Sequence, residues 1–153
     1  MRIGLGADHA GSVLKNVLAS FLAGAGYTIT DFGTNDPNVS VDYPLYAELV
    51  ARAVVGGKCD LGVLVCGTGI GMAIAANKVD GIRAAVIHDE ITARLAREHN
   101  DANVIAIGAR LTTPEAAIRM VQAFLGASFE TRHRRRIDEV TAIEVNGGGL
   151  KQP

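Results

Sequence analysis

Short apolar runs alternate with longer amphipathic stretches along most of the chain. The short runs are rich in β-branched and other apolar residues and are bounded by glycine or polar residues, which is typical of buried strands. They predict five strands at residues 2–6, 27–32, 61–65, 83–88 and 103–107. The longer stretches carry apolar residues at helical spacing or consist of helix formers without a breaker. They predict six helices at residues 11–25, 42–54, 72–76, 90–98, 113–125 and 129–143.

The alternation of strands and helices predicts one parallel sheet that is wound by right-handed crossovers and covered by helices on both faces. We therefore expect an α/β protein with a Rossmann-type three-layer fold and a five-stranded parallel sheet. No repeat or long linker interrupts residues 1–145, which form one predicted domain. Residues 146–153 are rich in glycine at their start and have no core-forming pattern, so we expect a flexible C-terminal tail there.

The stretch at residues 60–77 stands out because a buried strand runs directly into a glycine turn and a helix. Gly67, Gly69 and Gly71 follow Cys66 at alternate positions. Backbone N–H groups at such a helix start can bind an anion, and the same dipole favours the thiolate form of a cysteine. A reactive thiol beside an anion site is therefore the first hypothesis. The alternative is an ordinary tight turn with a buried, unreactive cysteine.

Other polar residues also follow predicted strands, at the edge of the sheet where α/β proteins bind ligands. They are Asp8, His9, His88, Asp89 and Arg110. Asp8 is equally typical of a helix cap. Two nucleotide-binding motifs are missing, because the dinucleotide fingerprint would need a glycine where Met72 stands and no Gly-Lys-Ser or Gly-Lys-Thr occurs.

Composition narrows the class of protein. The 153 residues carry a net charge of −1, with 48% hydrophobic and 20% charged residues, which favours a globular domain and argues against a dedicated nucleic-acid binder. No apolar run approaches the roughly 20 residues of a membrane span, and the N-terminus does not resemble a signal peptide, so we expect a cytoplasmic protein without membrane contact. Cys59 and Cys66 would lie roughly 20 Å apart along a strand, too far for a disulfide.

His99 poses a geometric problem. It follows a predicted helix and precedes a strand, which places it at the amino edge of the sheet, whereas Cys66 belongs to the carboxyl edge, roughly 17 Å away. If both serve one site, His99 must come from a second subunit, which predicts a homodimer with shared sites and leaves a tetramer open. Arg132 and Arg136 share one side of the last predicted helix and could clamp one anion, although such charge runs usually form a solvated face.

Taken together, these segments resemble the ribose-5-phosphate isomerase B family, which also includes galactose-6-phosphate isomerase subunits. The resemblance covers about residues 1–145 and rests on many motifs in the same order. They are Gly6-Ala7-Asp8-His9-Ala10-Gly11, Asp42-Tyr43-Pro44, Cys66-Gly67-Thr68-Gly69-Ile70-Gly71, Ala75-Ala76-Asn77-Lys78, Gly81-Ile82-Arg83-Ala84, Arg97-Glu98-His99-Asn100-Asp101-Ala102-Asn103-Val104, Gly108-Ala109-Arg110, and Arg132-His133 with Arg136.

The resemblance implies an aldose–ketose isomerase that acts on a phosphorylated sugar and needs no cofactor or metal. It assigns Cys66 as the base that removes the proton beside the carbonyl, and His99 as the residue that assists opening of the sugar ring. Because Met72 stands where another branch of the family has a glutamate base, the chain resembles the cysteine branch. The favoured reaction interconverts ribose 5-phosphate and ribulose 5-phosphate through an enediolate.

The resemblance also implies a set of substrate contacts. Backbone N–H groups of the turn would hold the enediolate oxygen, with Thr68 assisting; that turn contains Gly67, Gly69, Ile70 and Gly71. The sugar hydroxyls would be bound by Asp8, Tyr43 and Asn100. The phosphate would be bound by His9, Arg110, Arg132 and Arg136.

Three alternatives stay open at this point. The first is an isomerase of another sugar phosphate, such as allose 6-phosphate, galactose 6-phosphate or a tetrose phosphate, because pocket size decides between them. The second is a non-catalytic sugar-phosphate or nucleotide-binding module, which would leave Cys66 and His99 without a task. The third is a thiol redox sensor, which would need a resolving cysteine near Cys66 that the sequence does not offer.

Overall fold

A five-stranded parallel sheet forms the centre of the protein in the computed structural model, which describes residues 1–145. The strands are β1 (Arg2–Ala7), β2 (Thr28–Asp31), β3 (Leu61–Cys66), β4 (Ala84–Val86) and β5 (Val104–Gly108). They lie side by side in the order β2-β1-β3-β5-β4, and every neighbouring pair is parallel. The predicted sheet is therefore confirmed, whereas the predicted tail at residues 146–153 lies outside the described residues.

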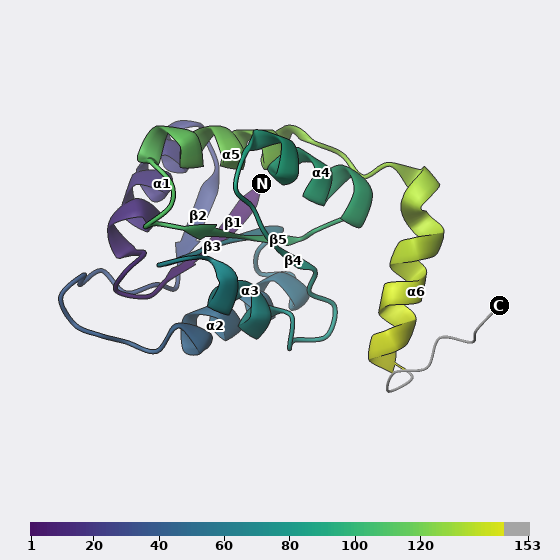
Figure 1. The fold of residues 1–153 in the computed structure, drawn as a ribbon, viewed down its shortest axis with the longest axis horizontal. Coiled ribbons are helices and arrows are strands. Elements are labelled where there is room, and N and C mark those ends of the chain that lie inside the picture. The colour runs from purple at the N-terminus through teal and green to yellow at the C-terminus, as the bar shows by residue number, and fades with distance from the viewer. Residues whose placement is uncertain (146–153) are drawn as a thin grey trace.

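Helices cover both faces of the sheet, which confirms the three-layer prediction (Figure 1). On one face, apolar side chains of α1 (Ser12–Gly24), α4 (Glu90–Asn100) and α5 (Pro114–Gly126) form a core cluster with the sheet. On the other face, α2 (Tyr43–Val55) and α3 (Ile70–Ala76) form a second cluster. A 3₁₀ turn at Thr131–His133 then leads into α6 (Arg134–Val145), which stands to one side of these layers (Figure 1).

The binding crevice of the sheet is expected between β1 and β3, the two strands at which the chain changes face. β1 and β3 are neighbours, but the chain leaves β1 toward α1 on one face and leaves β3 toward α3 on the other. Ligands of α/β proteins bind in the crevice between two such diverging connections. The start of α1 is packed tightly here, because a Cβ on Gly11 would lie 2.3 Å from the carbonyl oxygen of Val65.

Three elements differ from the sequence-based expectation. β4 covers only Ala84–Val86 because it is an edge strand with a single neighbour. The last helix starts at Arg134, not at residue 129, because Glu130 has an extended backbone and donates its N–H to the carbonyl of Glu98, 2.8 Å away. Leu45 and Leu49 on α2 are exposed although helical spacing favoured burial.

The cysteine prediction and the membrane prediction can also be compared with the structure. Cys59 and Cys66 are both buried and free, so the expectation of no disulfide between them is confirmed. Among residues 1–145, no helix is long and apolar enough to cross a membrane.

Candidate active site

A pocket of about 210 Å³ opens where β1 and β3 end. The polar groups around it come from four places: the turn after β3, the turn after β1, the N-terminus of α2, and the segment after β5. Its lining consists of Asp8, His9, Ala10, Tyr43, Cys66, Gly67, Thr68, Gly71 and Arg110. The structure therefore brings together, in a single chain, most of the residues that the sequence analysis assigned to chemistry at the carboxyl edge.

Cys66 is the last residue of β3 and is only 5% exposed. Its Sγ accepts a hydrogen bond from the backbone N–H of Gly69, 3.1 Å away. Gly69 has a φ of 80°, and a Cβ there would lie 3.1 Å from the carbonyl oxygen of Ala106. Glycine is needed at this position for both reasons. The turn thus points a backbone donor at the sulfur.

The turn is also crossed closely by two side chains. A Cβ on Gly67 would lie 3.3 Å from the guanidinium of Arg110, and a Cβ on Gly71 would lie 2.7 Å from the ring of Tyr43. The backbone N–H of Arg110 donates to the carbonyl of Gly67, 3.1 Å away, and so fixes the arginine beside the turn. The two glycines therefore allow a cation and a phenol to approach the cysteine. The hydroxyl of Thr68 lies 3.4 Å from the N–H of Ile70.

The turn after β1 supplies a carboxylate and an imidazole. Asp8 is 7% exposed, and its Oδ1 accepts a hydrogen bond of 3.0 Å from the N–H of Gly11. It therefore caps α1 and lines the pocket at the same time. The Nδ1 of His9 accepts a hydrogen bond of 3.2 Å from the N–H of Val41. A neutral His9 with this bond carries its proton on Nε2, which leaves Nε2 as a hydrogen-bond donor.

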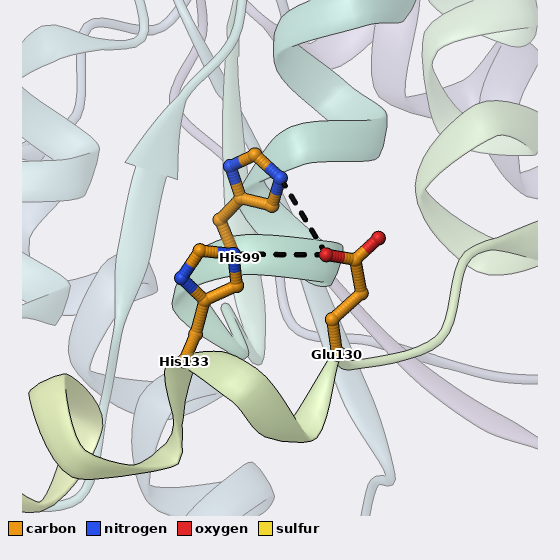
Figure 2. Close-up of side chains that lie close together, drawn as sticks. All are labelled: His99, Glu130 and His133. Carbon is orange, nitrogen blue, oxygen red and sulfur yellow. Dashed lines mark ion pairs between the residues drawn. The ribbon is translucent and has the colours of Figure 1, made fainter.

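A second cluster of polar side chains gathers around His99, which lies at the end of α4 before β5 begins (Figure 2). The Nε2 of His99 lies 3.9 Å from the Oε2 of Glu130 and 3.4 Å from an Nη2 of Arg132. The Nε of Arg132 donates to the same Oε2 at 2.7 Å, and its Nη2 forms an ion pair with that oxygen at 2.5 Å. His133 stacks against His99 with ring centroids 4.4 Å apart. We call these four side chains the His99 cluster.

Charge and burial shift two pKa values in the His99 cluster. The hydrogen bond from Arg132 lowers the pKa of Glu130 below its usual range, with the nearby charge of Arg132 acting in the same direction. Burial lowers the pKa of His133, and the charges of Arg132 and Arg136 add to the effect, while the charge of Glu130 opposes it. At neutral pH the cluster therefore contains an ionised carboxylate and a neutral His133.

The ligand atoms of His99, Glu130 and His133 lie within 4.8 Å of one another, close enough to raise the question of a metal ion. Two neighbouring arginines argue against a metal ion at this position. Arg132 already binds the carboxylate, and an Nη1 of Arg136 lies 3.2 Å from the Nδ1 of His133. A metal-bound histidine normally donates its other ring N–H to an acceptor, whereas a guanidinium offers only donors. The group fits an ion-pair network better than a metal site.

The predicted site residues thus fall into two groups within one chain. The first surrounds Cys66 at the carboxyl edge of the sheet. The second contains His99, Arg132 and Arg136 and lies beyond the amino end of β5. Asn100 does not line the pocket at Cys66. It lines a separate groove of about 340 Å³ together with Arg83 and Ile137.

Two members of the His99 cluster were not recognised as site residues from the sequence. Glu130 was not singled out, and His133 stood in a charge run and in the Arg132-His133 motif without a role of its own. A continuous helix from residue 129 would have placed these side chains differently. The 3₁₀ turn at Thr131–His133 brings Arg132 back onto Glu130 and His133 onto His99. This geometry is set by a backbone hydrogen bond from Glu130 to Glu98, 32 residues earlier in the chain. No local sequence pattern predicts that bond.

Comparison with known proteins gives a consistent result. The sequence pattern of the Ribose/Galactose Isomerase family matches residues 3–140. Ribose-5-phosphate isomerase B of Escherichia coli is 46% identical over 144 residues, 94% of this chain and 96% of that protein. D-erythrulose-4-phosphate isomerase of Pectobacterium atrosepticum is 46% identical over 130 residues, 85% of this chain and 86% of that protein.

A solved structure agrees in fold as well as in sequence. The structure of Clostridium thermocellum ribose-5-phosphate isomerase B superposes with a TM-score of 0.94 at 47% identity, covering 97% of this chain and 100% of that chain. The chain belongs to the ribose/galactose isomerase family.

Proposed function

We propose that this protein interconverts ribose 5-phosphate and ribulose 5-phosphate as an aldose–ketose isomerase. The observation that carries the proposal is Cys66, whose sulfur accepts a backbone N–H inside a polar pocket at the switch point of the sheet. Family membership and the names of the relatives support the same reaction class. The reaction moves hydrogen within one substrate, so it needs no external oxidant or reductant.

In the proposed mechanism, the Cys66 thiolate removes the proton from C2 of the open-chain aldose. The electron pair of the broken C–H bond forms the C1–C2 double bond of an enediolate, and the negative charge moves to O1. The thiol then returns its proton to C1, while the proton of the O2 hydroxyl passes to O1. The aldehyde becomes a hydroxymethyl group, C2 becomes the ketone, and no proton is gained or lost overall.

Backbone donors of the turn are suited to the developing negative charge. The N–H of Gly69 is used on the sulfur. Ile70 and Gly71 are the first residues of α3, and N–H groups at a helix start have no partner within the helix. Donors that are already in place stabilise an oxyanion without reorganisation. We assign the enediolate oxygen to this turn, with Thr68 beside it, and the sugar hydroxyls to Asp8 and Tyr43.

We further propose that the working unit is a homodimer in which each site combines the Cys66 pocket of one subunit with the His99 cluster of the other. His99 would assist ring opening, with Asn100 on a sugar hydroxyl. The phosphate would be held by His9, Arg110, Arg132 and Arg136. The two groups lie at opposite edges of the sheet in one chain, so they can meet only across an interface.

Exposed apolar side chains support such an interface. Leu45 on α2 is 56% exposed, and Ile70 and Ile74 on α3 are 52% and 57% exposed. They lie on the helical layer next to the pocket, where association would remove them from water. Two such dimers could also pair. The proposal includes a cytoplasmic location, because charged sugar phosphates do not cross membranes unaided.

The direct test is the conversion of ribose 5-phosphate to ribulose 5-phosphate by the purified protein with a chelator and without nucleotide. We expect turnover under these conditions. A series of phosphorylated aldoses with four, five and six carbons should show at least a tenfold preference for the pentose, which is about 1.4 kcal/mol in the transition state. Absence of turnover with every sugar phosphate would contradict the proposal and favour a binding module.

A tetrose phosphate is the second candidate substrate. The observation that favours it is the 46% identity to D-erythrulose-4-phosphate isomerase, which equals the identity to the Escherichia coli ribose-5-phosphate isomerase B. A higher kcat/KM for the four-carbon sugar phosphate than for ribose 5-phosphate would decide for this candidate. Allose 6-phosphate and galactose 6-phosphate belong to the same series and are judged by the same ratio.

A further inference from the structure

The Oε2 of Glu130 contacts the other three side chains of the His99 cluster. This oxygen accepts a hydrogen bond from the Nε of Arg132 and forms an ion pair with the Nη2 of the same side chain. It also lies 3.9 Å from the Nε2 of His99 and 3.6 Å from the Nε2 of His133. Both imidazoles therefore direct a ring nitrogen at the same carboxylate (Figure 2). Such convergence on one acceptor restricts the orientation of His99, whose side chain is otherwise 36% exposed at the end of a helix.

The carboxylate itself is held by the backbone. Glu130 donates its N–H to the carbonyl of Glu98, the residue just before His99, at 2.8 Å. It also accepts the N–H of His133 on its own carbonyl at 3.0 Å. Main-chain hydrogen bonds alone therefore hold the backbones of Glu98, Glu130 and His133 next to one another. Their relative positions follow from the fold rather than from flexible surface contacts.

His133 supports His99 from the other side. Its side chain is only 11% exposed, and its ring stacks on the ring of His99 at 4.4 Å and 37°. Arg136 lies 3.2 Å from its Nδ1, which fixes the acceptor role of that nitrogen and leaves the proton on Nε2. Within residues 1–145, that buried Nε2 has no hydrogen-bond partner, and the Glu130 carboxylate lies 3.6 Å from it. His99 is therefore held between a buried ring and an anion.

We propose that Glu130 is a positioning residue for ring opening. It acts through His99, whose ring also packs against the ring of His133. This inference rests on the proposed function. Ring opening breaks the bond between C1 and the ring oxygen, removes the proton of the C1 hydroxyl, and adds a proton to the ring oxygen. A single imidazole can perform both transfers only if its ring keeps one orientation between them, and the contacts with Glu130 and His133 restrict the orientation of His99.

The proposal separates ring opening from the chemistry at Cys66. Removal of the Glu130 charge should slow ring opening and leave C–H cleavage unchanged, because Cys66 lies in the other group of residues. Ring opening then becomes the slow step. The kinetic isotope effect of deuterium at C2 reports which step is slow, and a residue that merely stabilises the fold would not move it.

The experiment compares Glu130→Gln with the wild-type protein at saturating ribose 5-phosphate, so that weaker phosphate binding by Arg132 does not contribute. We expect turnover to fall at least about tenfold, with a C2-deuterium isotope effect close to one in the variant. Glu130→Asp keeps the charge and should recover part of the loss. Glu139→Gln is the matched control, since Glu139 binds Arg135 at 2.5 Å on α6 with a similar exposure, 43% against 39%.

Two results would overturn the inference. Unchanged turnover in Glu130→Gln would show that His99 does not depend on the carboxylate. Reduced turnover with a large isotope effect would show that the substitution acts on C–H cleavage instead. Both differ from a failure of the proposed function, in which the wild-type protein itself turns over no sugar phosphate.

Discussion

The Cys66 pocket and the His99 cluster are built in opposite ways. Cys66 ends a buried strand, is 5% exposed, and receives its hydrogen bond from the backbone of Gly69. The His99 cluster consists of long side chains, of which Glu130 is 39% and Arg132 is 65% exposed. Backbone geometry therefore fixes the first group up to the reactive sulfur, whereas in the second the main chain sets only the positions of the residues and ion pairs orient their long side chains.

This difference suggests a division of tasks. A base that must abstract one particular proton needs a fixed position, which a strand end and a glycine turn provide. Groups that bind a phosphate and open a ring must accommodate a substrate that changes shape, which exposed arginines can do. Substitutions in the first group should thus affect kcat, and those in the arginines of the second should affect KM.

The largest effect is expected for Cys66→Ala. Loss of a general base typically costs about 10²- to 10⁴-fold, so turnover of ribose 5-phosphate should fall by about that factor while substrate still binds. Calorimetric titration with ribose 5-phosphate measures the retained binding. Cys59→Ala is the matched control, because Cys59 is equally buried at 2% exposure but lies away from the pocket. Full turnover in Cys66→Ala would refute the assignment.

The next largest effect is expected for Arg136, which contacts His133 of the His99 cluster. Arg136→Ala should raise KM for the phosphorylated sugar by about ten- to a hundredfold with a smaller change in kcat, because a charge-assisted hydrogen bond is worth about 1.5–3 kcal/mol. Steady-state kinetics with ribose 5-phosphate checks the split. Arg135→Ala, which removes the neighbouring partner of Glu139, should leave KM unchanged. Equal KM values for both variants would place Arg136 on a solvated face.

A smaller effect is expected at Gly71. A Cβ there would lie 2.7 Å from the ring of Tyr43, whose side chain must move away from the pocket. Gly71→Ala should therefore lower kcat/KM about three- to tenfold without loss of the fold. Gly24→Ala is the control, since a Cβ at Gly24 would meet no atom of residues 1–145 within 4 Å. If both alanine variants behave like the wild-type protein, Tyr43 does not contribute to substrate binding.

The smallest effect concerns pH and stability. The pKa of His133 is lowered from 6.5 in the folded protein, so the unfolded chain takes up a proton first as pH falls below about 6.5. Folding stability therefore decreases through this window. Asp60 contributes only at lower pH, because its pKa is lowered to about 2 by Arg2.

The measurement is the Tm of the wild-type protein and of His133→Gln between pH 7.5 and 5.5. The wild-type Tm should fall by about 1–3 °C more than that of the variant. Parallel Tm curves for the two proteins would show that His133 does not titrate in a perturbed environment.

The Cys66 pocket could be predicted from the sequence because its determinants are local. The apolar run at residues 61–65 indicates a buried strand, and the alternating glycines after Cys66 indicate a turn at its end. Sheet topology then places that turn next to Asp8 and His9, since carboxyl ends of neighbouring parallel strands share one edge. These steps need only patterning and a general rule of α/β folds.

The internal geometry of the His99 cluster could not be predicted in this way. Arg132 and Arg136 were expected on one side of a single helix, but Arg132 lies in a 3₁₀ turn and Arg136 in α6, and they have different partners, Glu130 and His133. The turn arises from a backbone bond between Glu130 and Glu98. Side-chain networks that depend on such a tertiary contact leave no periodic signal in the sequence.

The central claim is that each active site joins the Cys66 pocket of one subunit to the His99 cluster of the other. The most direct test is a heterodimer of Cys66→Ala and His99→Asn subunits, purified through two different tags. One of its two sites would then contain both native residues, so we predict about half the wild-type turnover, far above either parent variant. Turnover no greater than that of the parents, or a protein that forms no dimer, would contradict the claim.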